Sequence, residues 1–235
     1  MIKVFLTEPS VFLKYCLAKG LKDYYIIFGL VFLLLFLVFS WLVHLDLLTK
    51  LDWFALFAAQ SITPVSFDLF FSFLSVIGSF EVYTLIALIS FVYYKKIIQS
   101  FYFFILYGLG HIIEIFSKSF IHHPGPASEF LRFNFPFHLL SAKFHPGFAY
   151  PSGHSMRTVF LVLLVIWCCF FYIKSTGLRF TIVFLSLLYM LAVLYSRVSL
   201  AEHWLSDVIG GSLLGVSLSC FMFAVFSFYE KHSDH

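Results

Sequence analysis

The sequence predicts an all-α membrane protein in which six transmembrane helices form a bundle, with an extracytoplasmic cap loop and an N-terminal interfacial helix. Of the 235 residues, 61% are hydrophobic and 22% are aromatic. Only 11% are charged, whereas a soluble domain usually carries about a quarter. Several apolar stretches also reach the roughly 20 residues that a helix needs to cross a bilayer. Composition and stretch length together favour a membrane protein over a soluble domain.

The predicted spans follow one another along most of the chain. They lie near residues 24–44, 68–94, 98–117, 155–173, 180–195 and 206–228. The first span, from Tyr24 to His44, contains no charged residue. Six spans leave no room for a second domain, so residues 24–228 are predicted to form one transmembrane domain, followed by a cytoplasmic tail at residues 229–235.

Two short segments outside these spans have the pattern of helices that lie on a membrane surface. In residues 1–23, a helix-start sequence at residues 7–10 precedes apolar residues at helical spacing, with lysines between them. We expect this amphipathic helix to lie on the inner surface of the membrane. A second interfacial piece is expected around residues 51–59, with Trp53 at the depth of the lipid headgroups.

Positive charges are distributed unequally between the two sides of the predicted bundle. With the N-terminus inside, nine lysines and arginines fall on the cytoplasmic side and six on the opposite side. The positive-inside rule therefore places both termini in the cytoplasm. The net charge of +3 is modest, and we expect a bilayer but no nucleic acid as a partner. The sequence leaves the oligomeric state open.

Polar residues concentrate in two loops that this topology puts on the extracytoplasmic side. The longer loop, about residues 118–152, holds most of the prolines and several histidines. Because proline blocks regular helix, this loop is expected to form an irregular cap. The shorter loop, with a polar run at residues 195–207, joins the fifth and sixth predicted spans. The two polar segments are therefore expected to meet.

The tetrapeptide Pro151-Ser152-Gly153-His154 directly precedes a predicted span, so a helix is expected to begin there. Unpaired N–H groups and the positive end of the helix dipole make a helix N-terminus suitable for binding an anion. The hydroxyl of Ser152 adds a hydrogen-bonding group, and Gly153 allows an anion to approach the backbone. His154 lies in the first turn, where it could donate a proton. A helix cap with an interfacial histidine remains the alternative.

Arg197, His203 and Asp207 extend this constellation in the shorter loop. His203 and Asp207 are four residues apart, which puts them on one face if the sixth helix starts near Glu202. A carboxylate that binds one imidazole nitrogen leaves the other nitrogen free as a nucleophile. Arg197 is always charged, and its forked guanidinium suits phosphate oxygens. The alternative is a surface salt bridge between Arg197 and Asp207.

These residues resemble the second and third signatures of the type 2 phosphatidic acid phosphatase superfamily. The second is Pro151-Ser152-Gly153-His154; the third is Ser196-Arg197, five residues, His203, three residues and Asp207. The resemblance covers about residues 60–228. It implies a six-span membrane lipid phosphatase in which His203 attacks phosphorus, Asp207 orients His203, and His154 protonates the leaving oxygen.

The resemblance further implies a phosphate site and no cofactor or metal. Arg197, Ser152 and the N–H of Gly153 would hold phosphate oxygens, as a preorganised oxyanion site should. The first family signature is a lysine, six residues and Arg-Pro. Here Lys118 and Pro126 match, but Gly125 replaces the arginine.

Three nearby residues could supply the missing positive charge: His123, Arg132 and Arg157. We expect Arg157 to do so, because it lies three residues after His154 and therefore on the adjacent turn of the same helix face. Glu114 precedes Lys118 by four residues and is expected to orient it. Glu81, in the middle of a predicted span, could be protonated, paired inside the bundle, or on a lipid access path.

The expected activity is hydrolysis of a membrane lipid phosphate or diphosphate, of the undecaprenyl diphosphate, phosphatidylglycerol phosphate, phosphatidic acid or lipid A type. The expected location is the bacterial inner membrane. A lipid phosphotransferase with the same site, and a catalytically weak transporter or structural homologue, are the alternatives.

Overall fold

The computed structural model describes residues 21–94, 97–133 and 148–233, and within these ranges the regular elements are helices. The amphipathic helix predicted for residues 1–23 lies almost entirely outside the described residues. So does the middle of the predicted cap loop. The all-helical membrane fold expected from the sequence is confirmed.

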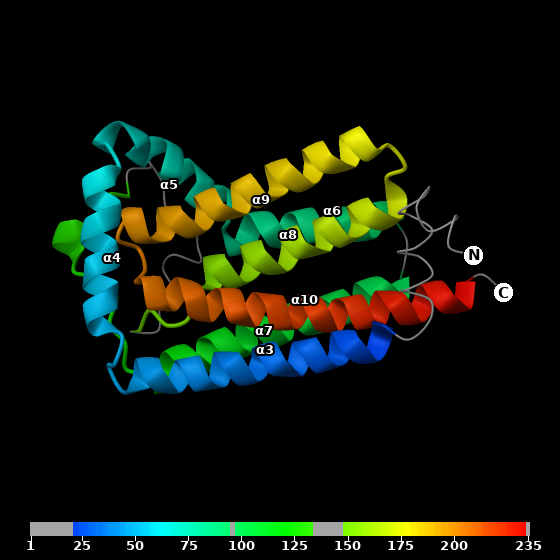
Figure 1. Cartoon of the computed structure of the whole chain (residues 1–235), viewed down its shortest axis with the longest axis horizontal. Helices are drawn as coiled ribbons and strands as arrows, with labels where there is room; N and C mark the ends of the chain where they lie inside the picture. Colours follow the sequence, from blue (N-terminus) through cyan, green and yellow to red (C-terminus); the bar gives the residue numbers. More distant parts are fainter. Residues whose placement is uncertain (1–20, 95–96, 134–147, 234–235) are drawn as a thin grey trace, which may run out of the picture.

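Five helices are long and apolar enough to cross a membrane, and they run lengthwise through the bundle (Figure 1). They match five of the six predicted spans. These helices are α3 (Leu21–His44), α7 (Ile97–Phe120), α8 (Gly153–Tyr172), α9 (Thr176–Ser199) and α10 (Leu205–Ser233). The start of α3 and the end of α10 lie at the same end of the bundle (Figure 1), as the predicted topology of the termini requires.

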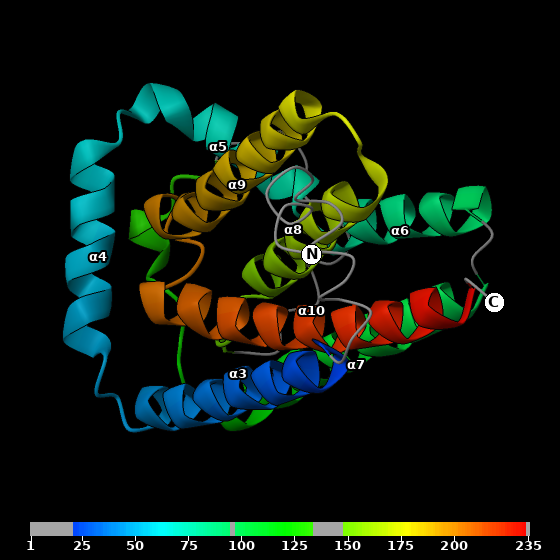
Figure 2. The same ribbon diagram turned by 45° about the vertical axis from the view of Figure 1, so that its right-hand side comes forward.

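The second predicted span is not one helix. Residues 68–94 form α5 (Asp68–Ile77) and α6 (Phe80–Tyr94), which follow each other along the bundle (Figures 1 and 2). The chain breaks at Gly78 and Ser79, where the Ser79 hydroxyl accepts a hydrogen bond from the Val82 N–H at 3.4 Å. A glycine followed by a serine that caps the next helix therefore interrupts an otherwise apolar stretch.

Helix α4 (Thr49–Ile62) runs across one end of the bundle, transverse to the long helices (Figures 1 and 2). It contains the segment expected to be interfacial. Its Leu56 and Ala59 are buried, whereas Phe54 is 71% exposed, so the helix presents one face to the bundle. A 3₁₀ turn, η1 (Val65–Phe67), then leads into α5 through a bend of 94° between the helical segments on either side of residues 63–64.

The described parts of the cap loop are fastened to the turn between α9 and α10. The indole N–H of Trp204 donates to the Pro124 carbonyl at 2.8 Å, and the Arg132 N–H donates to the Leu200 carbonyl at 3.0 Å. A short 3₁₀ turn, η2 (Ser128–Phe130), lies between these attachments. The two polar loops therefore meet, as the sequence predicts.

Close packing of α8 against α10 fixes the position of this turn relative to the start of α8. A Cβ atom on Gly211 would lie 2.3 Å from the Ser152 carbonyl oxygen, and one on Gly215 would lie 2.6 Å from that of Met156. Any larger side chain would push the two helices apart, as is common where helix backbones touch in a membrane. The glycines thus bring the start of α10 beside the N-terminus of α8.

Candidate active site

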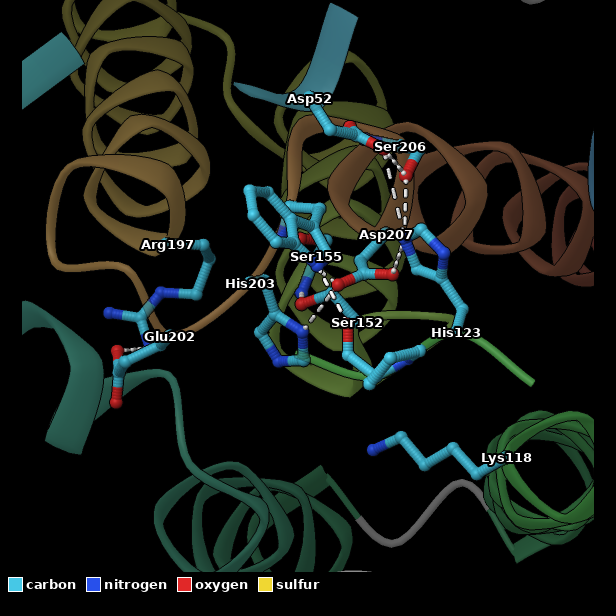
Figure 3. Close-up of polar contacts among 12 residues, drawn as sticks. Asp52, Lys118, His123, Ser152, Ser155, Arg197, Glu202, His203, Ser206 and Asp207 are labelled. Atoms are coloured by element: carbon cyan, nitrogen blue, oxygen red, sulfur yellow. Dashed lines mark hydrogen bonds and ion pairs between the residues drawn. The ribbon is translucent and has the colours of Figure 1, made fainter. Parts of the chain in front are cut away.

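The polar residues singled out from the sequence gather at the end of the bundle that α4 covers. Figure 3 shows Lys118 reaching from the end of α7 toward Ser152, His203 and Asp207, with Arg197 on the far side of His203. The site is therefore assembled from the end of α7, the start of α8, the end of α9 and the start of α10.

His203 and Asp207 contact each other directly. The His203 Nδ1 atom lies 3.2 Å from the Asp207 Oδ2 atom, and the same oxygen accepts a hydrogen bond from the Trp204 N–H at 2.9 Å. Helix α10 begins at Leu205, so the expected helix start near Glu202 is wrong. The pair forms because the turn before α10 brings the imidazole back over the first helical residues, and Ala201 adopts a left-handed φ of 55° in that turn.

A chain of contacts leads from Asp207 to three further residues, His123, Asp52 and Ser206. The sequence does not predict these contacts. His123 Nε2 lies 3.6 Å from Asp207 Oδ1 and 3.7 Å from Asp52 Oδ2. Asp52 accepts hydrogen bonds from the N–H and the hydroxyl of Ser206, each at 2.8 Å. His123 therefore contacts the carboxylates of α4 and α10. Its expected alternative role as a substitute for the missing arginine receives no support from these contacts. The feature of the sequence that points to this arrangement is the presence of an aspartate, Asp52, within an apolar segment.

The start of α8 has the predicted helix-terminus geometry. Ser152 is the N-cap residue, and its hydroxyl accepts a hydrogen bond from the Ser155 N–H at 3.4 Å. The Ser152 N–H donates to the Asp207 carbonyl at 3.0 Å, which ties this terminus to the first turn of α10. The His154 ring is partly buried, 3.5 Å from the place where a Cβ atom on Gly78 would lie.

Glu114 joins two of the candidate phosphate ligands. Its carboxylate lies 2.8 Å from Lys118 Nζ and 3.4 Å from Arg157 Nη1, and His111 Nδ1 is 3.2 Å away. The predicted contact between Glu114 and Lys118 is thus present. A Cβ atom on Gly153 would lie 2.1 Å from the Glu114 carboxylate, so glycine is needed there because the carboxylate rests against the start of α8.

Arg197 is fully buried and surrounded by oxygen atoms of the protein. Its Nη1 atom donates to the Ser75 hydroxyl at 2.6 Å and forms an ion pair with Glu202. Its Nη2 atom donates to the Ser196 hydroxyl at 2.8 Å. The sequence does not predict the contact of Arg197 with Ser75 on α5, because it predicts an uninterrupted span over residues 68–94.

The other candidate substitutes for the missing arginine differ in their surroundings. Arg132 pairs with Asp68 at 2.8 Å and donates to the carbonyls of Gln60 and Thr63, so it joins the cap to the α4–α5 corner. Arg157 is buried beside Glu114, and its Nε atom has no hydrogen-bond partner among the described residues. Among the described residues, Arg157 therefore has a buried guanidinium N–H without a partner.

Gly125 lines a pocket of about 310 Å³ that His123 and Asp52 also line. A Cβ atom at position 125 would meet only the Ala149 Cβ, at an ordinary contact distance of 3.6 Å. The arginine side chain of the family signature is thus absent, and no described residue fills the space in front of Gly125.

The surroundings of His203 favour its neutral form. Burial lowers the pKa of His203 to about 3, and the positive charges of Lys118 and Arg197 act in the same direction, while Glu202 and Glu114 oppose them. A histidine with this pKa is unprotonated at neutral pH and can use a ring nitrogen as a nucleophile.

Fold and site together define a multi-pass helical membrane protein with a buried histidine–carboxylate pair beside three cationic side chains. The chain belongs to the PAP2 superfamily, whose family model matches residues 98–231, and the resemblance found in the sequence is thereby confirmed. The structure is also similar to the crystal structure of a transmembrane PAP2 type phosphatidylglycerolphosphate phosphatase from Bacillus subtilis. The two are 21% identical, with a TM-score of 0.67, and the match covers 86% of this chain and 96% of that chain. No curated protein sequence matches the chain significantly.

The pKa of His203 leads to a prediction about the acid side of the pH profile. Since kcat/KM reports ionisations of the free enzyme and free substrate, and the pKa of His203 is lowered to about 3, protonation of His203 should not reduce kcat/KM until the pH falls below about 4. The NMR signals of the His203 imidazole, assigned by comparison with His203→Ala, should then show no titration between about pH 5 and 8. Titration of these signals near pH 6.5 would contradict this.

Proposed function

We propose that this protein is a membrane lipid phosphatase that hydrolyses a lipid phosphate or diphosphate through a phosphohistidine intermediate. The observation that carries the proposal is the pairing of His203 Nδ1 with Asp207 at 3.2 Å, at the place where Lys118 of α7, Arg197 of α9 and the start of α8 come together. Membership of the PAP2 superfamily supports phosphatase chemistry, and the Bacillus subtilis neighbour is titled a phosphatidylglycerolphosphate phosphatase.

In the proposed reaction, the Nε2 atom of His203 attacks phosphorus while the Nδ1–H group donates a hydrogen bond to Asp207. The new nitrogen–phosphorus bond forms as the bond from phosphorus to the lipid oxygen breaks. His154 gives a proton to that leaving oxygen. A water molecule then attacks phosphorus and gives a proton to His154, while the bond between phosphorus and Nε2 of His203 breaks; inorganic phosphate leaves, and both histidines return to their starting states.

The phosphate oxygens would be held by Arg197, Lys118, Ser152 and the backbone N–H of Gly153. Donors that are already fixed by the fold stabilise charge developing in a transition state without reorganising. Arg197 is fixed by Ser75 and Ser196, and Lys118 by Glu114.

Arg157 is proposed to add the guanidinium that Gly125 cannot supply. It is buried in the first turns of α8, and its Nε donor lacks a partner among the described residues, which suits it to a ligand oxygen.

Phosphate release from a panel of lipids tests the function directly. The detergent-solubilised protein is expected to release phosphate from at least one of phosphatidylglycerol phosphate, phosphatidic acid, undecaprenyl diphosphate and lipid A, in the presence of EDTA. His203→Ala should abolish release. His122→Ala should not, because His122 is exposed and lies outside the proposed machinery. Retention of most activity in His203→Ala would refute the proposed reaction, and transfer to a lipid acceptor in place of water would identify a phosphotransferase.

The unequal distribution of positive charges supports an extracytoplasmic site. A cysteine at the exposed Ala127, near the site, is expected to react with an impermeant thiol reagent in intact cells. A cysteine at the exposed Gly177, at the start of α9, should react only after the cells are opened. The reverse pattern would put the site in the cytoplasm.

Replacement of Arg157 tests its contribution to phosphate binding. Arg157→Ala should lower kcat/KM by about two orders of magnitude, as expected when a charged contact of roughly 3 kcal/mol is lost. Gly125→Arg in that background should restore part of the activity, because no described residue fills the space in front of residue 125.

Arg132→Ala provides the matched control, since it removes an arginine paired with Asp68 outside the proposed phosphate site. Thermal unfolding of each variant separates a loss of folding from a loss of chemistry. Near-wild-type kcat/KM in a folded Arg157→Ala protein would remove Arg157 from the site.

A further inference from the structure

Each proposed cationic phosphate ligand lies within ion-pair distance of a carboxylate of the protein. Lys118 and Arg157 contact Glu114, and Arg197 contacts Glu202. Together with Asp207, three carboxylates balance three cations around a neutral His203. Such a site has no excess positive charge with which to attract a phosphate dianion, so a phosphate must compete for its ligands.

The two glutamates differ in how firmly they are held. Glu114 is buried, contacts Lys118, Arg157 and His111, and rests against Gly153. The Glu202 side chain is 22% exposed and lies in the turn before α10. Apart from Arg197, the partner of this carboxylate among the described residues is the Ser75 hydroxyl, at 3.3 Å. Glu202 therefore loses fewer contacts than Glu114 when its carboxylate moves away from its cation.

The position of Glu202 puts it in competition with a phosphate oxygen. The Arg197 Nη1 atom is directed at both Ser75 and Glu202, while Nε and Nη2 donate to the Ser196 hydroxyl. Carboxylate and phosphate oxygens accept the same charge-assisted hydrogen bonds from a guanidinium. A phosphate oxygen that binds Nη1 must accordingly displace Glu202 or share the donor with it. Figure 3 shows the Arg197–Glu202 pair beside His203.

We propose that Glu202 is a displaceable competitor of phosphate for Arg197, and that it weakens the binding of inorganic phosphate so that this product leaves the site. The inference rests on the proposed phosphatase function. After the second step, the returning carboxylate takes over the guanidinium as phosphate departs. A lipid substrate also binds through its apolar chains, so it can occupy the site even though the competition lowers its affinity by a similar factor, whereas inorganic phosphate lacks this additional binding.

If the role of Glu202 is purely structural, its removal should change the affinity for phosphate in the opposite direction. If the carboxylate held Arg197 in its working orientation, its removal would leave a buried guanidinium without a fixed partner and would weaken phosphate binding. If it competes with phosphate, its removal frees a donor and strengthens binding. The direction of the change in phosphate affinity thus distinguishes the two roles.

The test compares Glu202→Gln with the wild type and with Glu129→Gln, which neutralises an exposed glutamate of η2. Inhibition of lipid turnover by inorganic phosphate gives one affinity, and calorimetric titration of the solubilised protein with inorganic phosphate gives another without any need for turnover. The inhibition constant and the dissociation constant should both fall about tenfold or more in Glu202→Gln, as expected for one charged contact, and should not change in Glu129→Gln.

Glu202→Asp serves as a second variant, because it keeps the charge and should retain an affinity within about threefold of wild type. Unchanged or weaker phosphate binding in folded Glu202→Gln would overturn the proposal. Should Glu202→Gln not fold, tighter binding in Glu202→Ala would support the proposal and weaker binding would overturn it. If inorganic phosphate binds more tightly to Glu202→Gln but the wild type has no lipid phosphatase activity, the proposed function is refuted. The competition between Glu202 and phosphate would still stand.

Discussion

Asp207 is a fully buried carboxylate at the first turn of a membrane-crossing helix, where an unpaired charge would be strongly destabilising. Its Oδ2 atom accepts from the Trp204 N–H and contacts His203, while Oδ1 faces His123. These contacts fold the turn before α10 back onto the helix and hold the imidazole beside the start of α8. The requirement that Asp207 be satisfied therefore determines where the proposed nucleophile lies.

The same constraint accounts for the other charged groups at this end of the bundle. Glu114 is buried among cations, and Arg197 pairs with Glu202. Asp52 links α4 to α10 through Ser206, and Arg132 links the cap to α5 through Asp68. In this arrangement the ion pairs assemble the site, and in the proposed function a phosphate would compete with the carboxylates for their cations.

The long helices and the main site residues could be predicted because they depend on local features: apolar stretches of sufficient length, a capped helix start, and residues spaced three or four apart. The break at Gly78 could not, because one glycine within an apolar run is compatible with a continuous helix. The contacts of His123 with Asp52 and of Arg197 with Ser75 join residues more than 70 positions apart, and no local spacing identifies them. The sequence predicts that Gly153 allows an anion to approach the backbone, and the structure adds a second reason for glycine there, the Glu114 carboxylate that rests against the start of α8.

The central claim is that His203, held neutral and oriented by Asp207, forms a covalent bond to phosphorus. Rapid mixing with a lipid bearing a radiolabelled phosphate, followed by an alkaline detergent quench that preserves phosphohistidine, measures this bond directly. Within the first turnover, the label should appear on the peptide that contains His203, and it should be absent in His203→Ala. Turnover of the lipid with no protein-bound label, or with label on a residue other than His203, would contradict the account.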